Sequence, residues 1–320
     1  MASPKPRLFD LRELGPRQVK PRRRPDLHLA DAPSEQMRLN PDGAGLVPGT
    51  TDGLPVRLVK PHSADKARTV SRDLGTVGRA MGNKWFKVHY LELFCGPGYL
   101  LDDVTREPVP GSPLQALTIQ RPFDNYVFSD FSDVCADALE RRIAAMRAEG
   151  IVLPPTAVLQ GDANDPAHLE RVCSLIDPRA LVIAYLDPAK PNLDWTTVEY
   201  LANRFRFIDF LINLPFSGIH RSLTAGGDER PRLMLNHPNP MELVNPEEGR
   251  TAQNIRDWYD QQLKSLGLVH IARRCVKTQT NSPLYDVVLA SRKDTAVKLF
   301  EKANPVPKVE PPASLFDMLG

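Results

Sequence analysis

Short apolar runs alternate with stretches of helical periodicity along most of this chain, and this alternation restricts the folds that the chain can adopt. A strand–helix unit that repeats places successive strands parallel to one another in one sheet. The run Ala180–Leu186 is almost entirely apolar, which suits a central parallel strand buried on both faces. Five units are predicted, with strands at residues 88–94, 125–130, 157–160, 180–186 and 210–214, and helices at residues 112–117, 133–147, 166–175, 195–205 and 252–266.

The last part of the chain departs from this pattern. Two predicted strands, at residues 270–277 and 284–291, flank a turn and indicate an antiparallel hairpin at the sheet edge, and a helix is expected at residues 295–303. The sequence therefore predicts an α/β fold with a doubly wound, mostly parallel seven-stranded sheet that ends in an antiparallel hairpin. An ordinary dinucleotide-binding fold would finish in parallel strands, whereas the predicted layout is that of class I methyltransferases.

Composition limits the class of protein further. Hydrophobic residues make up 42% and charged residues 25% of the 320 residues, as in soluble globular proteins, and the net charge of +2 does not by itself indicate nucleic acid. No apolar run reaches about 18 residues and the N-terminus lacks a signal-peptide core, so we expect a cytoplasmic protein without a membrane span. The four cysteines form no C-x-x-C pair, which argues against a zinc ribbon or an iron–sulfur site.

Both ends of the chain are rich in proline. Residues 1–60 are predicted to form a basic, disordered arm, because recurring prolines prevent a long helix or a central strand. The basic run Lys20–Arg24 within it is either an electrostatic arm for nucleic acid or a solvated tail. Residues 305–320 form a second proline-rich tail, whose end faintly resembles a sliding-clamp docking peptide.

Residues 61–304 are expected to form the methyltransferase-like domain. It would begin with a helix at residues 63–81, which carries Lys66 in its first turn. Residues 216–250 lose periodicity and gain glycine and proline, which is long for a loop in a compact domain. This insertion is therefore a candidate lid or partner surface.

A glycine turn follows the first predicted strand. Glycine can take positive φ and lets backbone approach a ligand closely. Phe94 occupies the position of the first glycine in the dinucleotide fingerprint, and no Walker loop occurs, so NAD is a weaker candidate and ATP is excluded. The pattern Glu92-x-Phe94-x-Gly96-x-Gly98 instead resembles the S-adenosylmethionine (SAM) loop of class I methyltransferases, the alternative being an ordinary strand–turn. An inserted loop then precedes Ser112, the expected N-cap of the next helix, and hints at a ligand or substrate role.

Acids stand at the ends of four consecutive predicted strands. In a parallel sheet these ends line one crevice, so the four side chains are expected to meet there. With SAM bound, Glu92 and the glycine turn would hold the methionine end, directly or through water, and Asp130 would accept hydrogen bonds from the ribose. Asp162, with the Ala163 N–H nearby, would meet the adenine, and Asp187 would face the sulfonium methyl group. The four acids are Glu92, Asp130, Asp162 and Asp187.

The dipeptide Asp187-Pro188 resembles the start of the [DN]-P-P-[YFW] motif of amino-group methyltransferases. There the acid or amide and the proline carbonyl accept hydrogen bonds from the target nitrogen, and the aromatic side chain stacks on a flipped base. Lys190 occupies the aromatic position in this chain, so Phe216 or Tyr185 would have to replace it. Cytosine-5 chemistry is disfavoured, because its Pro-Cys nucleophile dipeptide is absent.

Over residues 62–304 the sequence resembles the three-Cys-motif partner protein family (TcmP). The resemblance implies a methyltransferase-like fold and an association with radical-SAM-like proteins that carry a three-cysteine motif, but no established reaction. Ala189 and Lys190 depart from the aromatic and glycine that the family shows after Asp-Pro. The shared elements are a helix containing Lys66, Phe94-x-Gly96-Pro97-Gly98, Gly111-Ser112-Pro113-Leu114, Leu186-Asp187-Pro188, Phe210–Pro215 with Gly218-Ile219-x-Arg221, and Pro283-Leu284-Tyr285 with Ala290-Ser291-Arg292.

Two functions remain open at this stage. The first is a SAM-dependent methyltransferase that acts on a nitrogen, possibly of a nucleic acid, with Asp187 and Pro188 as catalytic residues. The second is a non-catalytic or SAM-sensing partner subunit that docks the three-Cys-motif protein through residues 216–250. The expected substrate or partner contacts are Lys66, Ser112, Lys190, Phe216 and Arg221.

Overall fold

The computed structural model describes residues 45–59, 85–225, 229–244, 250–277 and 283–303. Several sequence-based predictions fall outside these ranges and stay predictions. They concern the arm up to residue 44, the helix at residues 63–81 with Lys66, and the C-terminal tail.

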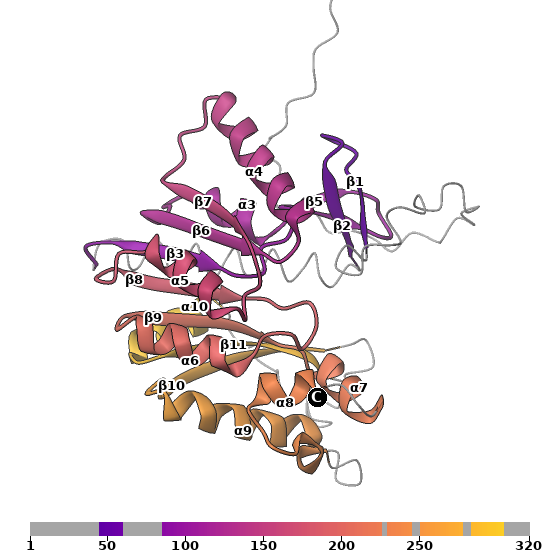
Figure 1. Ribbon diagram of the computed structural model, residues 1–320, viewed down its shortest axis with the longest axis vertical. Coiled ribbons are helices and arrows are strands. Elements are labelled where there is room, and N and C mark those ends of the chain that lie inside the picture. The colour runs from indigo at the N-terminus through magenta and orange to yellow at the C-terminus, as the bar shows by residue number, and fades with distance from the viewer. Residues whose placement is uncertain (1–44, 60–84, 226–228, 245–249, 278–282, 304–320) are drawn as a thin grey trace, which may run out of the picture.

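A seven-stranded sheet, the main sheet, forms the centre of the molecule (Figure 1). Its order is β10-β11-β9-β8-β3-β6-β7, and β11 runs antiparallel to both of its neighbours, while the strands from β9 to β7 are parallel. This order and these directions define the class I methyltransferase-like fold, so the predicted fold class is confirmed. The strands are β3 (Val88–Glu92), β6 (Asn125–Asp130), β7 (Thr156–Gln160), β8 (Leu181–Leu186), β9 (Ile208–Leu214), β10 (His270–Lys277) and β11 (Pro283–Ser291).

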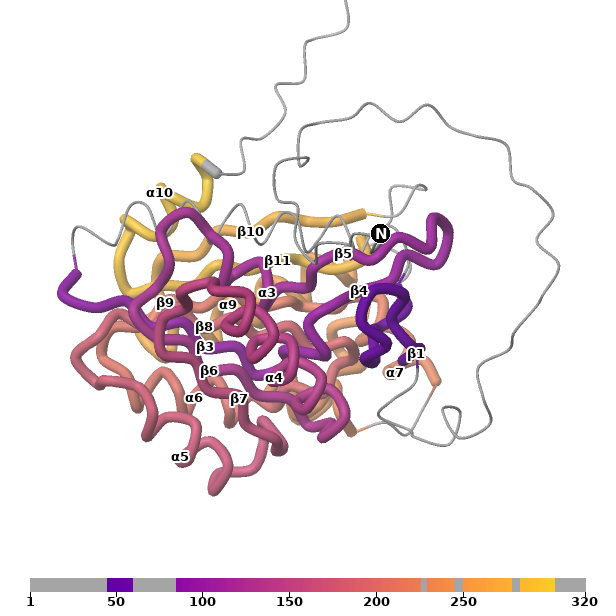
Figure 2. The backbone as a smooth tube through the Cα atoms, turned by 90° about the horizontal axis from the view of Figure 1, so that it is seen from above, coloured from indigo at the N-terminus to yellow at the C-terminus, as the bar shows by residue number. Residues whose placement is uncertain are grey.

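Helices cover both faces of the main sheet, and Figure 2 shows α5 and α10 on opposite sides of it. The side chains of α5, α6, α8 and α9 pack in one core layer, and those of α3, α4 and α10 pack in the other. The helices are α3 (Ser112–Leu117), α4 (Asp133–Ala148), α5 (Pro166–Ser174), α6 (Trp195–Arg204), α7 (Phe216–Ala225), α8 (Arg230–Leu235), α9 (Thr251–Ser265) and α10 (Asp294–Ala303).

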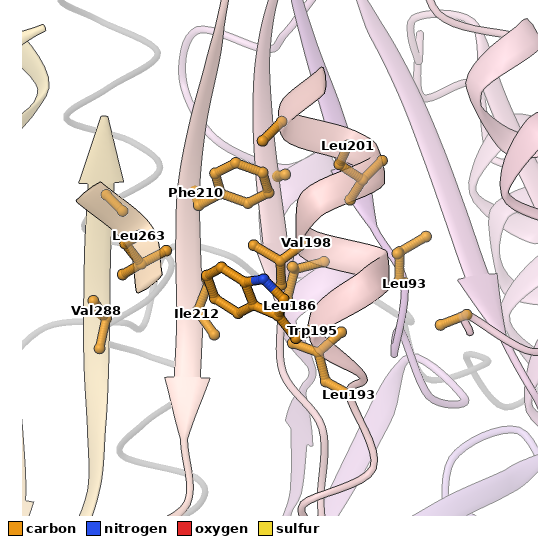
Figure 3. Packing of buried hydrophobic residues seen from close by; sticks show 14 of the residues in the cluster. Leu93, Leu186, Leu193, Trp195, Val198, Leu201, Phe210, Ile212, Leu263 and Val288 are labelled. Carbon is orange, nitrogen blue, oxygen red and sulfur yellow. The ribbon is translucent and has the colours of Figure 1, made fainter. Parts of the chain in front are cut away.

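The two core layers follow from alternation along the strands. In β9, Ile212 belongs to one layer and Leu211 to the other, as period-two side chains on a doubly covered strand require. Figure 3 shows the first layer, where Trp195 and Val198 of α6 pack against Ile212 and neighbouring strand residues. Burial of such side chains on both faces fixes the register of the sheet, because a slip of one residue would exchange the two layers.

N-cap residues stand at the starts of several of these helices. The Ser132 hydroxyl accepts a hydrogen bond from the Cys135 N–H at 3.3 Å, so Ser132 rather than Asp133 caps α4. The Asp165 carboxylate caps α5, which opens on Pro166. Gly111, not Ser112, stands at the N-cap of α3. These differences of one residue leave the predicted order of elements unchanged.

A second sheet of four strands lies beside α4, and we call it the small sheet (Figure 1). The small sheet corrects two predictions. Residues 45–59 contribute two of its strands and so are not part of a disordered arm, and the inserted loop after Gly98 contributes the other two. Strand β2 pairs in parallel with β4, although β3 of the main sheet lies between them in the chain. The prolines of the small sheet stand at strand ends or edges, where a missing N–H is tolerated. The strands, in spatial order, are β1 (Leu46–Pro48), β2 (Pro55–Val59), β4 (Tyr99–Asp102) and β5 (Pro108–Pro110).

The predicted insertion at residues 216–250 is also more ordered than expected. Its described part contains α7, α8 and the 3₁₀ helix η2 (Pro240–Leu243). Phe216, Ile219 and Leu223 share one buried face of α7, while Pro231 and Pro240 stand in the first turns of their helices, where proline is favoured. The glycine and proline content therefore marks the starts of short helices rather than one long loop.

Candidate functional site

A cleft of about 720 Å³ opens at the carboxyl ends of the parallel strands. Its volume lies within the range of roughly 300–1,000 Å³ that small-molecule sites occupy. Most of the predicted site residues line it, although they come from distant parts of the chain. Those that do are Phe94, Gly96, Gly98, Ser112, Asp130, Asp162, Ala163, Asp187, Lys190 and Arg221.

The glycine turn forms the floor of the cleft beside β3. Gly96 and Gly98 have φ values of 64° and 97°, in the left-handed region that glycine adopts without strain. A side chain on Gly96 would meet no atom within 4 Å, so this position borders open space. The Gly111 N–H donates to the Gly98 carbonyl at 2.7 Å, and a Cβ on Gly111 would lie only 2.9 Å from that oxygen. The Gly-Ser-Pro element is therefore packed directly on the turn.

Arg142 of α4 holds this turn from behind. Its side chain is 1% exposed and donates to the Pro97 carbonyl at 2.5 Å and to the Pro55 carbonyl at 2.8 Å. Two further hydrogen bonds reach the Asp52 carboxylate. The sequence analysis did not identify this residue, although an arginine on the apolar face of a helix, beside Leu139 and Met146, was a usable signal.

Glu92 lies beneath the cleft rather than in its wall. Its side chain is fully buried and accepts hydrogen bonds from the Ser112 hydroxyl at 2.5 Å and the Tyr90 hydroxyl at 3.0 Å. Burial raises the pKa of Glu92 well above its usual value, and the negative charges of Asp187 and Asp130 add to this, while the two hydrogen bonds oppose it. Glu92 does not itself line the cleft, because Ser112 stands between this carboxyl and the cleft, and its predicted role in holding a ligand, directly or through water, stays a prediction.

Asp130 and Asp162 lie at the β6 and β7 end of the cleft. Asp130 is 8% exposed and accepts hydrogen bonds from the Gly96 N–H at 2.7 Å and the Ser132 N–H at 3.0 Å. Asp162 is exposed, and one of its oxygens accepts from the Asn164 N–H at 2.9 Å. The Phe131 ring lines the cleft between them and is 52% exposed, an apolar surface that the sequence analysis missed.

Asp187 lies at the centre of the cleft, after β8. The Tyr185 hydroxyl donates to its Oδ2 at 2.8 Å and so fixes the carboxylate in place. Pro188 is buried and does not line the cleft, and its carbonyl accepts from the Asn213 Nδ2 at 3.4 Å. The structure thus brings the predicted acid into the cleft but places the predicted proline behind it.

The remaining predicted contacts divide between wall and core. Lys190 and Arg221 are exposed on the side of the cleft nearest β9, whereas Phe216 is 4% exposed and belongs to the core. The Arg256 guanidinium lies 4.9 Å from the Phe216 ring centre, so this ring cannot stack on a substrate in the cleft. Cleft residues that sequence reasoning did not single out include Arg57, Asn192, Asn213, Ser217 and Arg230.

Within the described parts of the chain, no three His, Cys, Asp or Glu side chains are grouped to hold a metal ion. No helix found there is long and apolar enough to cross a membrane. The cysteines form no disulfide, and burial raises the pKa of the Cys95 thiol well above its usual value. The cleft itself is lined by glycine backbone, carboxylates and cations.

The order and directions of the strands define a class I methyltransferase-like fold, and the cleft lies at the carboxyl ends of its parallel strands. Solved structures with a similar fold include an O-methyltransferase from Bacillus cereus in complex with SAH (11% identity, 73% of this chain and 82% of that chain, TM-score 0.42). A protein from Legionella pneumophila (13%, 73% and 89%, 0.42) and a putative RNA methyltransferase from Pyrococcus horikoshii (12%, 70% and 81%, 0.34) are also similar. No protein-family model and no curated protein matches the chain. Similarity at this level carries no functional argument, and the fold assignment rests on the order and directions of the strands.

Proposed function

We propose that this protein is a SAM-dependent methyltransferase that acts on a nitrogen atom. The observation that carries the proposal is that one cleft contains the Gly96–Gly98 turn, the carboxylates of Asp130 and Asp162, and, beyond them, Asp187. In this fold, the crevice at the carboxyl ends of the strands is the expected place for a nucleoside ligand.

The described residues fit SAM. The open space at Gly96 leaves room for a ligand against the backbone of the turn, and Arg57, on the same side of the cleft, supplies a positive charge for the methionine carboxylate. The Asp130 carboxylate lines the cleft beside the Gly96 N–H, where ribose hydroxyls would donate to it. The exposed Asp162 carboxylate and the Phe131 ring suit the adenine amino group and the adenine face.

Bound SAM supplies an electrophilic methyl group on a sulfonium. The task of the protein is then to orient an acceptor nitrogen toward that group, which proximity and alignment make effective. Asp187 accepts a hydrogen bond from the acceptor amino group, and the Tyr185 hydroxyl keeps this carboxylate in one orientation. Asn213 lies next to this position in the cleft wall, so a second polar side chain is available to the acceptor.

Calorimetry with SAM and S-adenosylhomocysteine tests the proposal. We expect the wild type to bind both, and the Gly96→Val and Asp162→Ala variants to bind at least about tenfold more weakly, a loss of about 1.4 kcal/mol. Gly150→Val is the matched control, because Gly150 also has positive φ and open space around it but lies outside the cleft. Absence of binding by the wild type, or equal binding by Gly96→Val and Gly150→Val, would refute the proposal.

A second candidate is a partner subunit of a three-Cys-motif protein. Lys190, which is exposed, stands where an amino-group methyltransferase carries its stacking aromatic, and this difference favours a binding role over catalysis. The exposed side chains of Leu233 and Met241, on α8 and η2, would then contact the partner. Co-purification with the three-Cys-motif protein should be retained in Asp187→Ala and in Val152→Glu, and it should be lost in the double variant Leu233→Glu plus Met241→Glu. Loss with Asp187→Ala or Val152→Glu, or survival with the double variant, would exclude docking there.

A further inference from the structure

Charge is divided along the cleft. Its three carboxylates are those of Asp130, Asp162 and Asp187, at the ends of β6, β7 and β8. From Lys190 to the end of the described chain, the lining side chains are neutral or positive, and Lys190, Arg221 and Arg230 supply the positive charges. We call this part of the wall the cationic half. Because SAM would occupy the acidic half, the cationic half faces the methyl acceptor.

The charged side chains of Lys190 and Arg221 are exposed to solvent. Among the residues that the structure describes, neither side chain forms a hydrogen bond or an ion pair, in contrast to the buried cations Arg142 and Arg256, which are held by carboxylates. Like charges that share one concave surface focus a positive potential, which attracts an anionic ligand. Nothing in the described structure of the cationic half balances these two charges.

The N-terminus of α7 opens into the same half. Pro215 and Ser217 line the cleft at this end of the ten-residue helix, and the Ile219 N–H already donates to the Pro215 carbonyl. The first N–H groups of a helix have no partner within the helix and, together with the helix dipole, favour an anion. The amide of Asn192 and the hydroxyl of Ser217 add neutral donors, which are typical phosphate contacts.

Asn213 provides an independent sign of a ligand. It lines the cleft, is 95% buried, and donates from Nδ2 to the Pro188 carbonyl. Its Oδ1 has no hydrogen-bond partner among the described residues. A buried acceptor that lacks a donor costs free energy, and an amino group of a ligand in the cleft would supply that donor. The cleft therefore suits a methyl acceptor that carries both an N–H donor and a negative charge.

We propose that the cationic half binds a phosphate group of the methyl acceptor, which is a nucleotide, either free or within a single strand of nucleic acid. The inference rests on the proposed function, because it assigns the acidic half to SAM. Lys190 and Arg221 contact the phosphate, and Asn213 accepts from an amino group of the base. Replacement of the usual aromatic by Lys190 exchanges base stacking for attraction to phosphate at this position.

The test measures binding to the full-length protein without SAM. The ligands are adenosine, AMP, cytidine, CMP, and 12-nucleotide single strands of RNA and DNA. We expect each nucleotide or strand to bind at least about tenfold more tightly than its nucleoside. In the double variant Lys190→Ala plus Arg221→Ala, the ratio of nucleotide to nucleoside affinity should fall to near one. For the strands, the slope of the logarithm of the binding constant against the logarithm of salt concentration should become shallower by about one unit per cation removed. Tight binding of the nucleotides alone indicates a free nucleotide, and tighter binding of a strand indicates a nucleic acid.

Two variants complete the design. Arg179→Ala removes a cation that is 81% exposed and outside the cleft, and it should keep the wild-type preference. Asn213→Leu should weaken nucleoside and nucleotide equally. Equal affinity for nucleoside and nucleotide, or an unchanged preference in the double variant, would overturn the inference. If SAM binds but no phosphate preference appears, only this inference fails; if phosphate binds but SAM does not, only the proposed function fails.

Discussion

The Arg142 guanidinium donates two hydrogen bonds, of 2.8 and 3.0 Å, to the Asp52 carboxylate, which lies 90 residues earlier in the chain. The contact joins α4 to the small sheet, and the same guanidinium holds the Pro97 carbonyl of the glycine turn. Burial alone would raise the pKa of Asp52, but the hydrogen bonds and charge of Arg142 outweigh it and lower the pKa below its usual value. One buried cation thus couples the small sheet to the floor of the cleft.

Arg142→Met should lower the free energy of unfolding by about 3–5 kcal/mol, because it leaves Asp52 without its cation and removes the donor to the Pro55 and Pro97 carbonyls. Urea denaturation monitored by circular dichroism measures the change. Arg141→Met is the matched control, since Arg141 is 62% exposed and its ion pair with Asp137 lies on the surface. This control should change the free energy by less than about 1 kcal/mol. Equal effects of the two substitutions would contradict the proposed coupling.

Asp209 should make stability depend on pH. It is buried beside Ser291 at the start of β9, and burial raises its pKa to about 6, against an ordinary 3.8, although the Ser291 hydrogen bond opposes the shift. The folded state then binds the proton more tightly, so wild-type stability falls as pH rises from about 3.8 to about 6. Relative to the wild type, Asp209→Asn should gain about 3 kcal/mol across this window.

Urea denaturation at pH 3.5 and pH 7 measures this gain. Asp103→Asn serves as the control, because Asp103 is exposed, and its stability relative to the wild type should be the same at both pH values. If Asp209→Asn behaved like this control, the buried carboxyl would not be the source of the pH dependence.

Ser112→Ala should destabilise the fold by about 1–3 kcal/mol, because Glu92 loses a buried donor. The Ser112 hydrogen bond lowers the pKa of Glu92 against burial, so its loss should raise that pKa further. Since a carboxyl with a raised pKa loses stability as pH rises, the cost should be larger at pH 8 than at pH 4. Thermal unfolding at both pH values measures this, and a cost that did not vary with pH would show that Glu92 is not the affected group. Thr105→Ala, which alters an exposed hydrogen bond, is the control.

Gly161→Ala should be costly for a steric reason alone. A Cβ on Gly161 would overlap the ring of His168, which is fully buried and hydrogen-bonded to Ser129 at 2.7 Å. Overpacking of this kind costs about 1–3 kcal/mol. In a His168→Ala background the same substitution should cost far less, because the overlap is gone. A double-mutant cycle from urea denaturation measures the coupling, and additive effects would contradict this explanation.

Much of the fold could be predicted from sequence, because the main sheet depends on local patterns. The strand–helix order, the C-terminal hairpin and the glycine turn follow from periodicity and turn chemistry over short windows. The positions of Asp130, Asp162 and Asp187 in one cleft then follow from the rule that parallel strands end at one edge. Predicted element boundaries differ from the structure by one or two residues, as at Ile208, where β9 starts two residues before its expected position.

The small sheet and the fates of individual aromatic side chains could not be predicted in this way. Strand β2 is stabilised by parallel pairing of Arg57 with Leu100, which no local pattern encodes. Phe131 and Phe216 each follow a strand closely, yet one is half exposed in the cleft and the other is buried beneath Arg256. Their burial depends on which element packs over them.

The order of strands and helices, the glycine turn and the acids at the strand ends can be predicted from sequence, because they depend on periodicity and on residues close in the chain. Three features depend instead on how distant segments pack: Ser112 separates Glu92 from the cleft, Arg142 joins the glycine turn to the small sheet, and Asn213 is buried with an acceptor that no described residue satisfies. Burial and long-range pairing are properties of the packed chain. They raise the pKa of the Glu92 carboxyl and decide which charged side chains line the cleft.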